Sequence, residues 1–456
     1  MRILKRILIT LGVFIGILSI ISLFLFTWVD RTPYQEMEYY SQTMEAMGQT
    51  EASDIISVGD TLEIGWGKES LVPEERVPLA GYGKRQGALY DNVHDTIWAK
   101  SFVFDNGVSK TAFVTMDLLI VPMEVTRLLP EALDSMGYNA SNIFLSAGHS
   151  HCSIGGWGTG LAGELFAGSY DQAVVDFIVK SAASAIYNAE KHKQKAGVGY
   201  AEIRAADLVR NRLVGDQKGT IDPWIRMLKF ENESGEAALL TTYSAHSTCL
   251  SHRFHDLSAD YPGELCKNLE VLENIDFAAF AAGAMGSMTS LAPQPKEWSR
   301  VEYYAKEVSK PVALMQNAVP LKYDSILGNF SSPLYLRQPH FRISENIRAR
   351  PWVFDLLMGS YPSEITSLRI GNILFVGTPC DFSGELVEPL TKKARQAGLN
   401  LVITSFNGGY AGYITKDEWY DLDKYETRVM NWFGPYNGAY FSEVIEKVID
   451  LHAEAL

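Results

Sequence analysis

The stretch FLSAGHSHCSIGGWG, Phe144 to Gly158, places two histidines between a short apolar run and a glycine-rich loop. The apolar run predicts a buried β-strand, and the glycines predict that a loop follows it. His149 and His151 occupy alternate positions where this strand ends, although the chain has only nine histidines. In layered α/β folds, such strand ends often carry catalytic side chains. An H-x-H pair alone is a modest signal for a metal site, so further ligands are needed.

Three other apolar runs end in residues that bind metal ions or donate protons. AALLTTYSA leads to His246, ILFVGTPC leads to Asp381, and LVITSFNGG leads to Tyr410. Each residue also has a structural explanation, such as Asp381 capping a helix or Tyr410 lying on the surface as an amphipathic aromatic. Four strands that end alike favour a shared site, because strand ends on one side of a sheet lie close together.

The rest of the sequence alternates β-like runs with amphipathic helical stretches. Strand patterns cover residues 61–67, 101–107 and 225–232, and helical patterns cover residues 124–137, 170–192 and 383–398. The chain has 456 residues, of which 47% are hydrophobic, enough for a substantial core. We therefore expect an α/β (α+β) layered fold, in which helices flank multi-stranded sheets.

The N-terminus predicts a membrane anchor. Residues 1–6 carry Arg2, Lys5 and Arg6, whereas residues 7–29 carry no charge. At ~1.5 Å per residue, the apolar run is long enough to cross a hydrocarbon core of ~30 Å. It ends without a small-x-small cleavage site, and the positive charges precede it. We expect a single-pass signal anchor in the cell membrane, with the N-terminus in the cytoplasm and the rest outside.

Residues 30–55 are polar and predict a stalk or linker that is helical in part, and residues 56–456 predict the folded domain. The net charge of −14 argues against nucleic-acid binding, which needs clustered Lys and Arg. The four cysteines form no C-x-x-C pair, which argues against a structural zinc ribbon. Two alternatives stay open for the cysteines, namely a Cys249–Cys266 disulfide or free thiols that are mostly buried.

From about Ile56 to its end, the sequence resembles the catalytic domain of the neutral ceramidase family, zinc amidohydrolases that split the N-acyl bond of ceramide. The resemblance rests on short segments that occur in the family's order: VPLAGYGKRQG, NVHDTIWAKSFVF, LSAGHSHCSIGG, VRNRL, YSAHSTCL, GNILFVGTPCDF and NGGYAGYITKDEWYDLDKYE. They are similar to the family patterns T-H-T-H-S-G-P, N-R, A-x-H-P, P-G-E-F and N-x-Y-x-x-Y-x-T.

The resemblance implies one zinc ion (Zn²⁺) per chain, with these ligands: His149, His246, Asp381 and Tyr410. It implies that His151, Arg212 and Tyr420 line the site beside the metal. Zinc lowers the pKa of its bound water toward ~7, so that hydroxide is available to attack an amide carbonyl. Arg212 and Tyr420 would stabilise the developing oxyanion, and His151 would protonate the leaving amine. His94 also lies in a family-like segment, and for this residue a structural role is at least as strongly expected as a role in the site.

The sequence also departs from the family pattern. The usual Glu is replaced by Asp381, which is one methylene shorter. The family's G-D-V-S-P-N segment, which carries a serine, is replaced by GAMGSMTSLAP, in which Thr289 falls nearest the serine and Ser287 and Ser290 are in reach. We expect no C-terminal Ig-like sandwich domain of the kind found in eukaryotic members. These changes favour amide hydrolysis in general over ceramide as the particular substrate.

We therefore expect a membrane-anchored, extracytoplasmic, zinc-dependent amidohydrolase that acts on a ceramide-like or other lipid-like N-acyl amide. Six aromatic residues are candidates for an acyl-chain groove, although such residues more often belong to a core: Trp157, Phe166, Trp352, Trp419, Trp432 and Phe433. Two alternatives stay open. One is a deacylase or esterase that acts on N-acyl amino acids or cell-wall amides, and the other is a non-catalytic surface binding protein that retained the fold.

Overall fold

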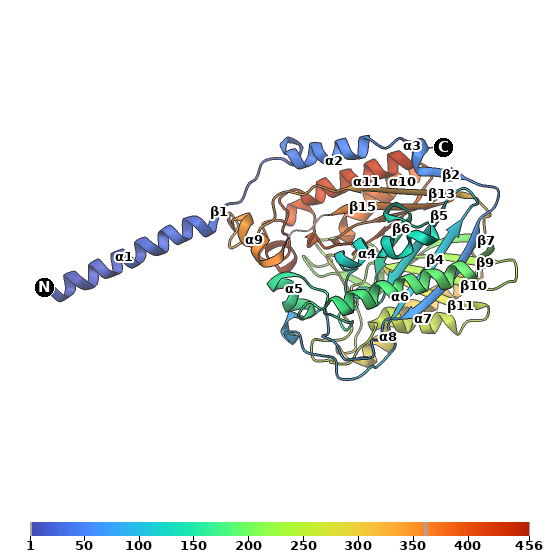
Figure 1. Cartoon of the computed structure of the whole chain (residues 1–456), viewed down its shortest axis with the longest axis horizontal. Helices are drawn as coiled ribbons and strands as arrows, with labels where there is room; N and C mark the ends of the chain where they lie inside the picture. The colour runs from blue at the N-terminus through green and yellow to red at the C-terminus, as the bar shows by residue number, and fades with distance from the viewer. Residues whose placement is uncertain (1, 360–362, 456) are drawn as a thin grey trace.

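The computed structural model describes residues 2–359 and 363–455, and two β-sheets form its centre (Figure 1). The larger sheet has eight strands, in the spatial order β11 (Ile275–Ala282), β10 (Ala237–Tyr243), β9 (Trp224–Asn232), β7 (Gln194–Arg204), β3 (Glu63–Ser70), β4 (Trp98–Asp105), β5 (Lys110–Met116) and β6 (Ile143–Ala147). The smaller sheet has five strands, in the order β18 (Asn400–Thr404), β16 (Ile373–Gly377), β15 (Glu364–Ile370), β13 (Ile326–Pro333) and β2 (Ile56–Val58).

The two sheets pack face to face through an apolar layer to which both contribute. Phe113 and Phe144 of the larger sheet contact Phe375 of the smaller one, with ring centroids 5.3 Å and 6.0 Å apart. Strands β6 and β16 are buried along their whole length. Because both faces of these strands are buried, their sequences are continuous apolar runs.

Helices cover the outer face of each sheet. Those on the larger sheet include α4 (Met123–Leu133), α6 (Gln172–Lys191), α7 (Asp260–Glu270) and α8 (Trp298–Met315). Those on the smaller sheet include α10 (Val387–Gln396) and α11 (Asn437–Glu454). The sequence of α6 explains why this segment forms a helix that packs on the sheet. Asp171 caps its first turn, and apolar residues at helical spacing form a buried stripe. The four-layer arrangement confirms the expected layered α/β fold.

The strands that lead to the predicted site residues end together. Strand β5 runs parallel to β6, β10 to β11, and β16 to β18. Hydrogen bonds join the ends of the two sheets: the Ser405 amide, after β18, donates to the Ala282 carbonyl of β11 over 3.0 Å. The Asn407 side chain also donates to the Leu145 carbonyl of β6. Short pairs continue beyond these ends, namely β8 (Val209–Asn211) with β12 (Met288–Ser290) and β17 (Asp381–Phe382) with β19 (Tyr413–Ile414).

Helix α1 (Arg2–Leu25) extends away from the domain (Figure 1). The expected anchor, residues 7–29, thus includes most of α1 and also β1 (Phe26–Trp28), which pairs with β14 (Ile347–Ala349). Immediately after β14 comes α9 (Pro351–Met358), which abuts α5 (Gly160–Ala167): a Cβ on Gly160 would lie 2.8 Å from the Leu357 carbonyl oxygen.

Residues 30–55, the expected stalk or linker, are helical in part. They form α2 (Glu38–Gly48) and α3 (Ala52–Ile55), which lie along the domain (Figure 1). The reason is an apolar stripe in this segment: Tyr34, Tyr39 and Met47 are buried, and the Tyr39 ring packs edge-on against Tyr440 of α11 at 5.1 Å. Elsewhere, all four cysteines are buried free thiols, so the Cys249–Cys266 disulfide is absent.

Candidate functional site

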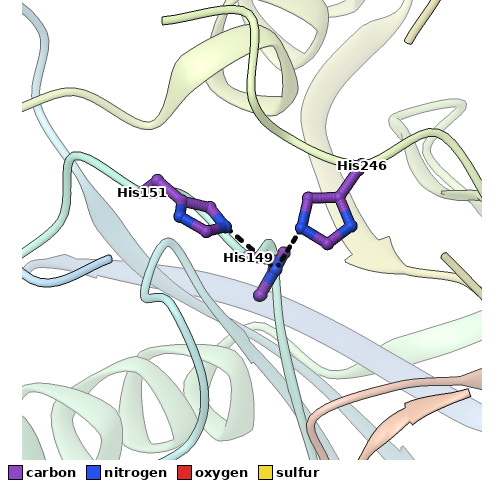
Figure 2. Close-up of side chains that lie close together, drawn as sticks. All are labelled: His149, His151 and His246. Carbon is purple, nitrogen blue, oxygen red and sulfur yellow. Dashed lines mark hydrogen bonds between the residues drawn. The ribbon is translucent and has the colours of Figure 1, made fainter. Parts of the chain in front are cut away.

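Three histidines from two strand ends meet at one point (Figure 2). The Nε2 atom of His149 lies 2.9 Å from Nε2 of His246 and 3.1 Å from Nε2 of His151. One ligand atom of each ring lies within 4.8 Å of the others. The structure therefore brings together side chains that lie 97 positions apart in the chain. This geometry is compatible with metal binding.

His149 and His151 lie on the turn that follows β6. The Gly148 amide donates to the Met116 carbonyl over 2.8 Å, which ends the strand, and His149 then adopts a left-handed conformation with φ of 63°. Non-glycine residues seldom adopt this conformation, and such residues cluster at functional sites. Residues two positions apart point to the same face of an extended segment, so His149 and His151 can both contribute a ring to this cluster.

Burial keeps the three imidazoles neutral. It lowers the pKa of His149 to about 3, and lowers the pKa values of His151 and His246 well below their usual range, with nearby positive charge from Arg212 acting in the same direction. His149 Nδ1 donates to the Leu119 carbonyl over 2.6 Å, which leaves the Nε2 lone pair directed at the other two rings. Neutral imidazole is the form that binds metal ions.

Asp381 and Tyr410 lie beside the histidines. Asp381 is buried, and its Oδ1 atom lies 3.9 Å from Nδ1 of His246 and has no hydrogen-bond donor among the described residues. Its Oδ2 atom accepts a hydrogen bond from the Tyr410 hydroxyl over 2.7 Å. Burial raises the pKa of Asp381 to about 7, although the Tyr410 hydrogen bond and the Arg212 charge act in the opposite direction. The four predicted ligands are thus neighbours, and Tyr410 contacts the carboxylate directly.

Arg212 approaches Asp381 from the loop after β8. Its Nε atom donates to Glu426 over 2.7 Å, and its terminal nitrogen donates to the Tyr413 hydroxyl over 2.9 Å. Tyr413 and Tyr425 both line the cavity described below, and neither was assigned a role from the sequence. A signal for Tyr413 was present, because the Y-x-x-Y-x-T part of the family pattern falls on Tyr410, Tyr413 and Thr415, whereas none of the quoted patterns marks Tyr425.

Tyr420 and Thr289 lie elsewhere and do not line this cavity. The Tyr420 hydroxyl lies 3.3 Å from Nε2 of His340, and the Arg342 guanidinium lies 3.6 Å from the centroid of its ring. Thr289 pairs with the exposed Arg210 across β12 and β8. Ser287 lies closer to the site residues, because its carbonyl accepts from the Arg212 amide over 2.9 Å.

The cluster opens into an apolar cavity of about 130 Å³. Three of the predicted groove aromatics line it, Trp157, Phe166 and Trp432, together with residues that include Leu119, Met358 and Met430. His149, His151, Asp381 and Tyr410 line the same cavity. The other three groove candidates do not: Trp352 is exposed on α9, Trp419 donates to Glu385, and Phe433 packs in the core. His94 also lies elsewhere, with its ring against Trp298.

Comparisons with known proteins identify a family and a shared fold. The profile of the family described as neutral/alkaline non-lysosomal ceramidase, N-terminal, matches residues 63–290. The neutral ceramidase of Pseudomonas aeruginosa is 25% identical over 217 residues, which are 44% of this chain and 32% of that enzyme, so the match spans about a third of the relative's length.

Two solved structures share the fold. The crystal structure of neutral ceramidase from Pseudomonas aeruginosa has a TM-score of 0.74 and 19% identity, over 88% of this chain and 75% of that one. A ceramidase complexed with C2 has a TM-score of 0.75 and 18% identity, over 86% of this chain and 74% of that one. The matched profile covers half of the sequence, including His149, His151 and His246, and this chain therefore belongs to the neutral/alkaline non-lysosomal ceramidase family.

Proposed function

We propose that this chain is a membrane-anchored zinc amidohydrolase that cleaves the N-acyl bond of a ceramide-like or other lipid amide, with its catalytic domain outside the cytoplasm. The observation that carries the proposal is the convergence of three neutral imidazoles, two of which line an apolar cavity, in a member of the ceramidase family. Neutral imidazoles suit a metal ion, and an apolar cavity with few polar groups suits an acyl chain.

The residues of the cluster fit a zinc ion. Asp381 Oδ1 is buried without a donor among the described residues, and a cation beside it would compensate the cost of burying the carboxylate. We infer that one ion per chain is held by these residues: His149, His246, Asp381 and Tyr410. When bound, zinc supplies a Lewis acid and lowers the pKa of water toward ~7, which provides a nucleophile at neutral pH.

The chain's own residues supply the proton transfer and the charge stabilisation. His151 is not a proposed zinc ligand, and its Nδ1 has no hydrogen-bond partner among the described residues, so this nitrogen can take up a proton and deliver it to the leaving nitrogen. Arg212 and Tyr413 form a hydrogen-bonded pair of donors for the negative charge that develops on the carbonyl oxygen. Tyr420 and Thr289 have no part in this proposal, because Tyr420 contacts His340 and Arg342, and Thr289 pairs with Arg210.

The membrane assignment rests on α1. The segment Ile3–Leu25 has a mean hydropathy of 2.7, and none of it is buried against the domain. A free helix of this length and composition is stable when it crosses a bilayer. Lys5 and Arg6 precede most of it, and positive charge favours the cytoplasmic side.

The test uses the full chain in detergent micelles, with metal content measured by mass spectrometry and fatty-acid release measured from ceramide, an N-acyl amino acid and a fatty-acid ester. We expect about one zinc per chain and hydrolysis of the lipid amide. His149→Ala and His246→Ala should lose both the metal and at least about a thousandfold in kcat/KM. His192→Ala, at the exposed end of α6, is the matched control and should change neither.

The other outcomes would each contradict the proposal. Release from the N-acyl amino acid or the ester alone would favour a deacylase or esterase. A folded chain that binds no metal and releases no fatty acid would favour a binding protein that retained the fold.

A further inference from the structure

We propose that α5 and α9 form a rim that rests in the outer surface of the bilayer that α1 crosses, so that the cavity receives its substrate directly from that leaflet. The rim is defined by the outward side chains of Leu161, Leu165, Trp352 and Leu356. This inference rests on the proposed membrane anchoring and adds to it a fixed orientation of the domain.

The first observation is an exposed apolar surface on two adjacent helices. Leu161 and Leu165 of α5 are 66% and 47% exposed, and Trp352 and Leu356 of α9 are 49% and 67% exposed. Each pair is spaced by four residues, so both members lie on the same face of their helix. A contiguous apolar patch on a soluble surface marks an interaction site, whereas single exposed leucines need no explanation.

The second observation is that α9 holds the end of α1. The Arg350 amide donates to the Leu25 carbonyl over 2.8 Å, and its guanidinium donates to the Leu23 carbonyl over 3.1 Å. Trp352 Nε1 donates to the Phe24 carbonyl over 3.3 Å. The last carbonyls of a helix have no partner within it, and here α9 and the residue before it provide the donors. Pairing of β1 with β14 adds a second link.

These links connect the anchor to the rim without a flexible stalk. Helix α1 leaves the domain on the side that carries α5 and α9 (Figure 1). Where α1 emerges from the hydrocarbon, the rim must therefore lie close to the membrane surface. Trp28 lies at the end of the expected anchor, and tryptophan is enriched where a membrane-spanning helix meets the membrane–water interface. Glu164 and Asp355, exposed on the same two helices, favour contact at the headgroup boundary over deeper insertion.

The third observation is that the rim and the cavity share the same helices. While Leu161 and Leu165 face outward, their neighbours Ala162 and Phe166 line the cavity, and Met358 of α9 lines it as well. An acyl chain that leaves the leaflet at the rim thus meets an apolar lining that continues to the histidines. A lipid bilayer is therefore the partner that this surface fits, rather than another protein.

The test measures contact with lipid independently of catalysis. Leu161→Cys and Leu356→Cys are labelled with an environment-sensitive fluorophore, since the four native thiols are buried. Val271→Cys, at an 82% exposed position at the end of α7, is the matched control. In phosphatidylcholine vesicles that hold the full chain and nitroxide-labelled lipid, the rim labels should be quenched at least about threefold more than the control.

A second arm measures entry of substrate. Leu161→Glu with Leu356→Glu should lower hydrolysis of a long-chain amide embedded in vesicles by about tenfold or more, because charged side chains oppose contact of this surface with lipid. Hydrolysis of a water-soluble short-chain amide should stay within about twofold, since neither residue lines the cavity.

The failures are distinguishable. If the chain floats with the vesicles but rim and control labels are quenched equally, the rim proposal is overturned and the anchor stands. Rim labels that are already shielded in detergent would indicate a protein partner or a second copy, and would overturn it as well. If the chain does not float with vesicles, the anchoring part of the proposed function fails.

Discussion

The ring of Phe406 lies flat against the imidazole of His149, with centroids 3.8 Å apart and planes 2° apart. Both residues have left-handed backbones, with φ of 66° and 63°. His149 follows β6 of the larger sheet and Phe406 follows β18 of the smaller one, so this stack joins the two sheets at a proposed metal ligand. Strained conformations persist only where surrounding packing enforces them.

We expect Phe406→Leu to weaken zinc binding by about tenfold, because groups that orient a ligand typically contribute 10–100-fold in affinity. A leucine fills much of the volume but cannot hold the imidazole plane. The measurement is competition with a chromophoric chelator. Phe375→Leu, at a buried position between the sheets, is the control and should lower the melting temperature without changing zinc affinity. Equal zinc affinity in wild type and Phe406→Leu would contradict the positioning role.

Tyr410→Phe and Tyr420→Phe should behave differently. The first removes the hydroxyl that donates to Asp381, so we expect kcat/KM to fall by about tenfold or more. The second keeps the ring that packs on Arg342 and loses only a 3.3 Å contact with His340, so activity should stay within about twofold. Steady-state kinetics on the same lipid amide decide the matter. Loss of activity in Tyr420→Phe would restore the role that the resemblance implied.

Which strands end at the site was predictable from the sequence, because buried strands leave continuous apolar runs that stop at the polar residue. The runs before His149, His246 and Asp381 correspond to β6, β10 and β16. The convergence of the two histidines was likewise predictable, since strand ends on one edge of a sheet lie together.

Tyr425 and the rim were not predictable in the same way. Tyr425 begins a π-helical turn, Tyr425–Val429, which follows neither helical nor strand spacing. Helices α5 and α9 have eight residues each and are apolar on most of their surface, so their sequences show no amphipathic pattern that would predict a helix. The packing of α2 against α11 depends on tertiary contacts of Tyr39 that local composition does not reveal.

Arg212→Ala should both destabilise the protein and abolish activity. It leaves Glu426, whose side chain is 8% exposed, as an unpaired buried charge, which costs about 3–5 kcal/mol. The double variant Arg212→Ala with Glu426→Gln removes that charge and should recover most of the melting temperature, while activity stays absent. Thermal melting and the lipid-amide assay separate the two effects. If the double variant also regained activity, Arg212 would not stabilise charge in the reaction.

His452 gives the folded protein a pH dependence that is separate from the metal site. Burial lowers its pKa to about 3, with the Arg369 charge acting in the same direction, whereas the ordinary value is 6.5. Because the folded-state pKa is the lower one, the unfolded chain takes up a proton as the pH falls below 6.5 and the folded chain does not. The contribution of neutral His452 to the free energy of unfolding is therefore fully present above pH 6.5 and is lost as the pH falls toward 3.

We expect the free energy of unfolding to fall by about 1 kcal/mol per pH unit for this residue between about pH 6 and pH 4. His340, whose pKa burial also lowers to about 3, contributes with the same sign. His452→Gln keeps a hydrogen-bonding group opposite Ser367 but cannot be protonated. The free energy of unfolding of this variant should therefore depend less steeply on pH, by the amount that His452 contributes in the wild type. Denaturant unfolding of the full chain in detergent at several pH values measures this slope. An equally steep profile in His452→Gln would mean that the wild-type ring is charged in the folded state, since only a group that changes protonation on unfolding contributes to the slope.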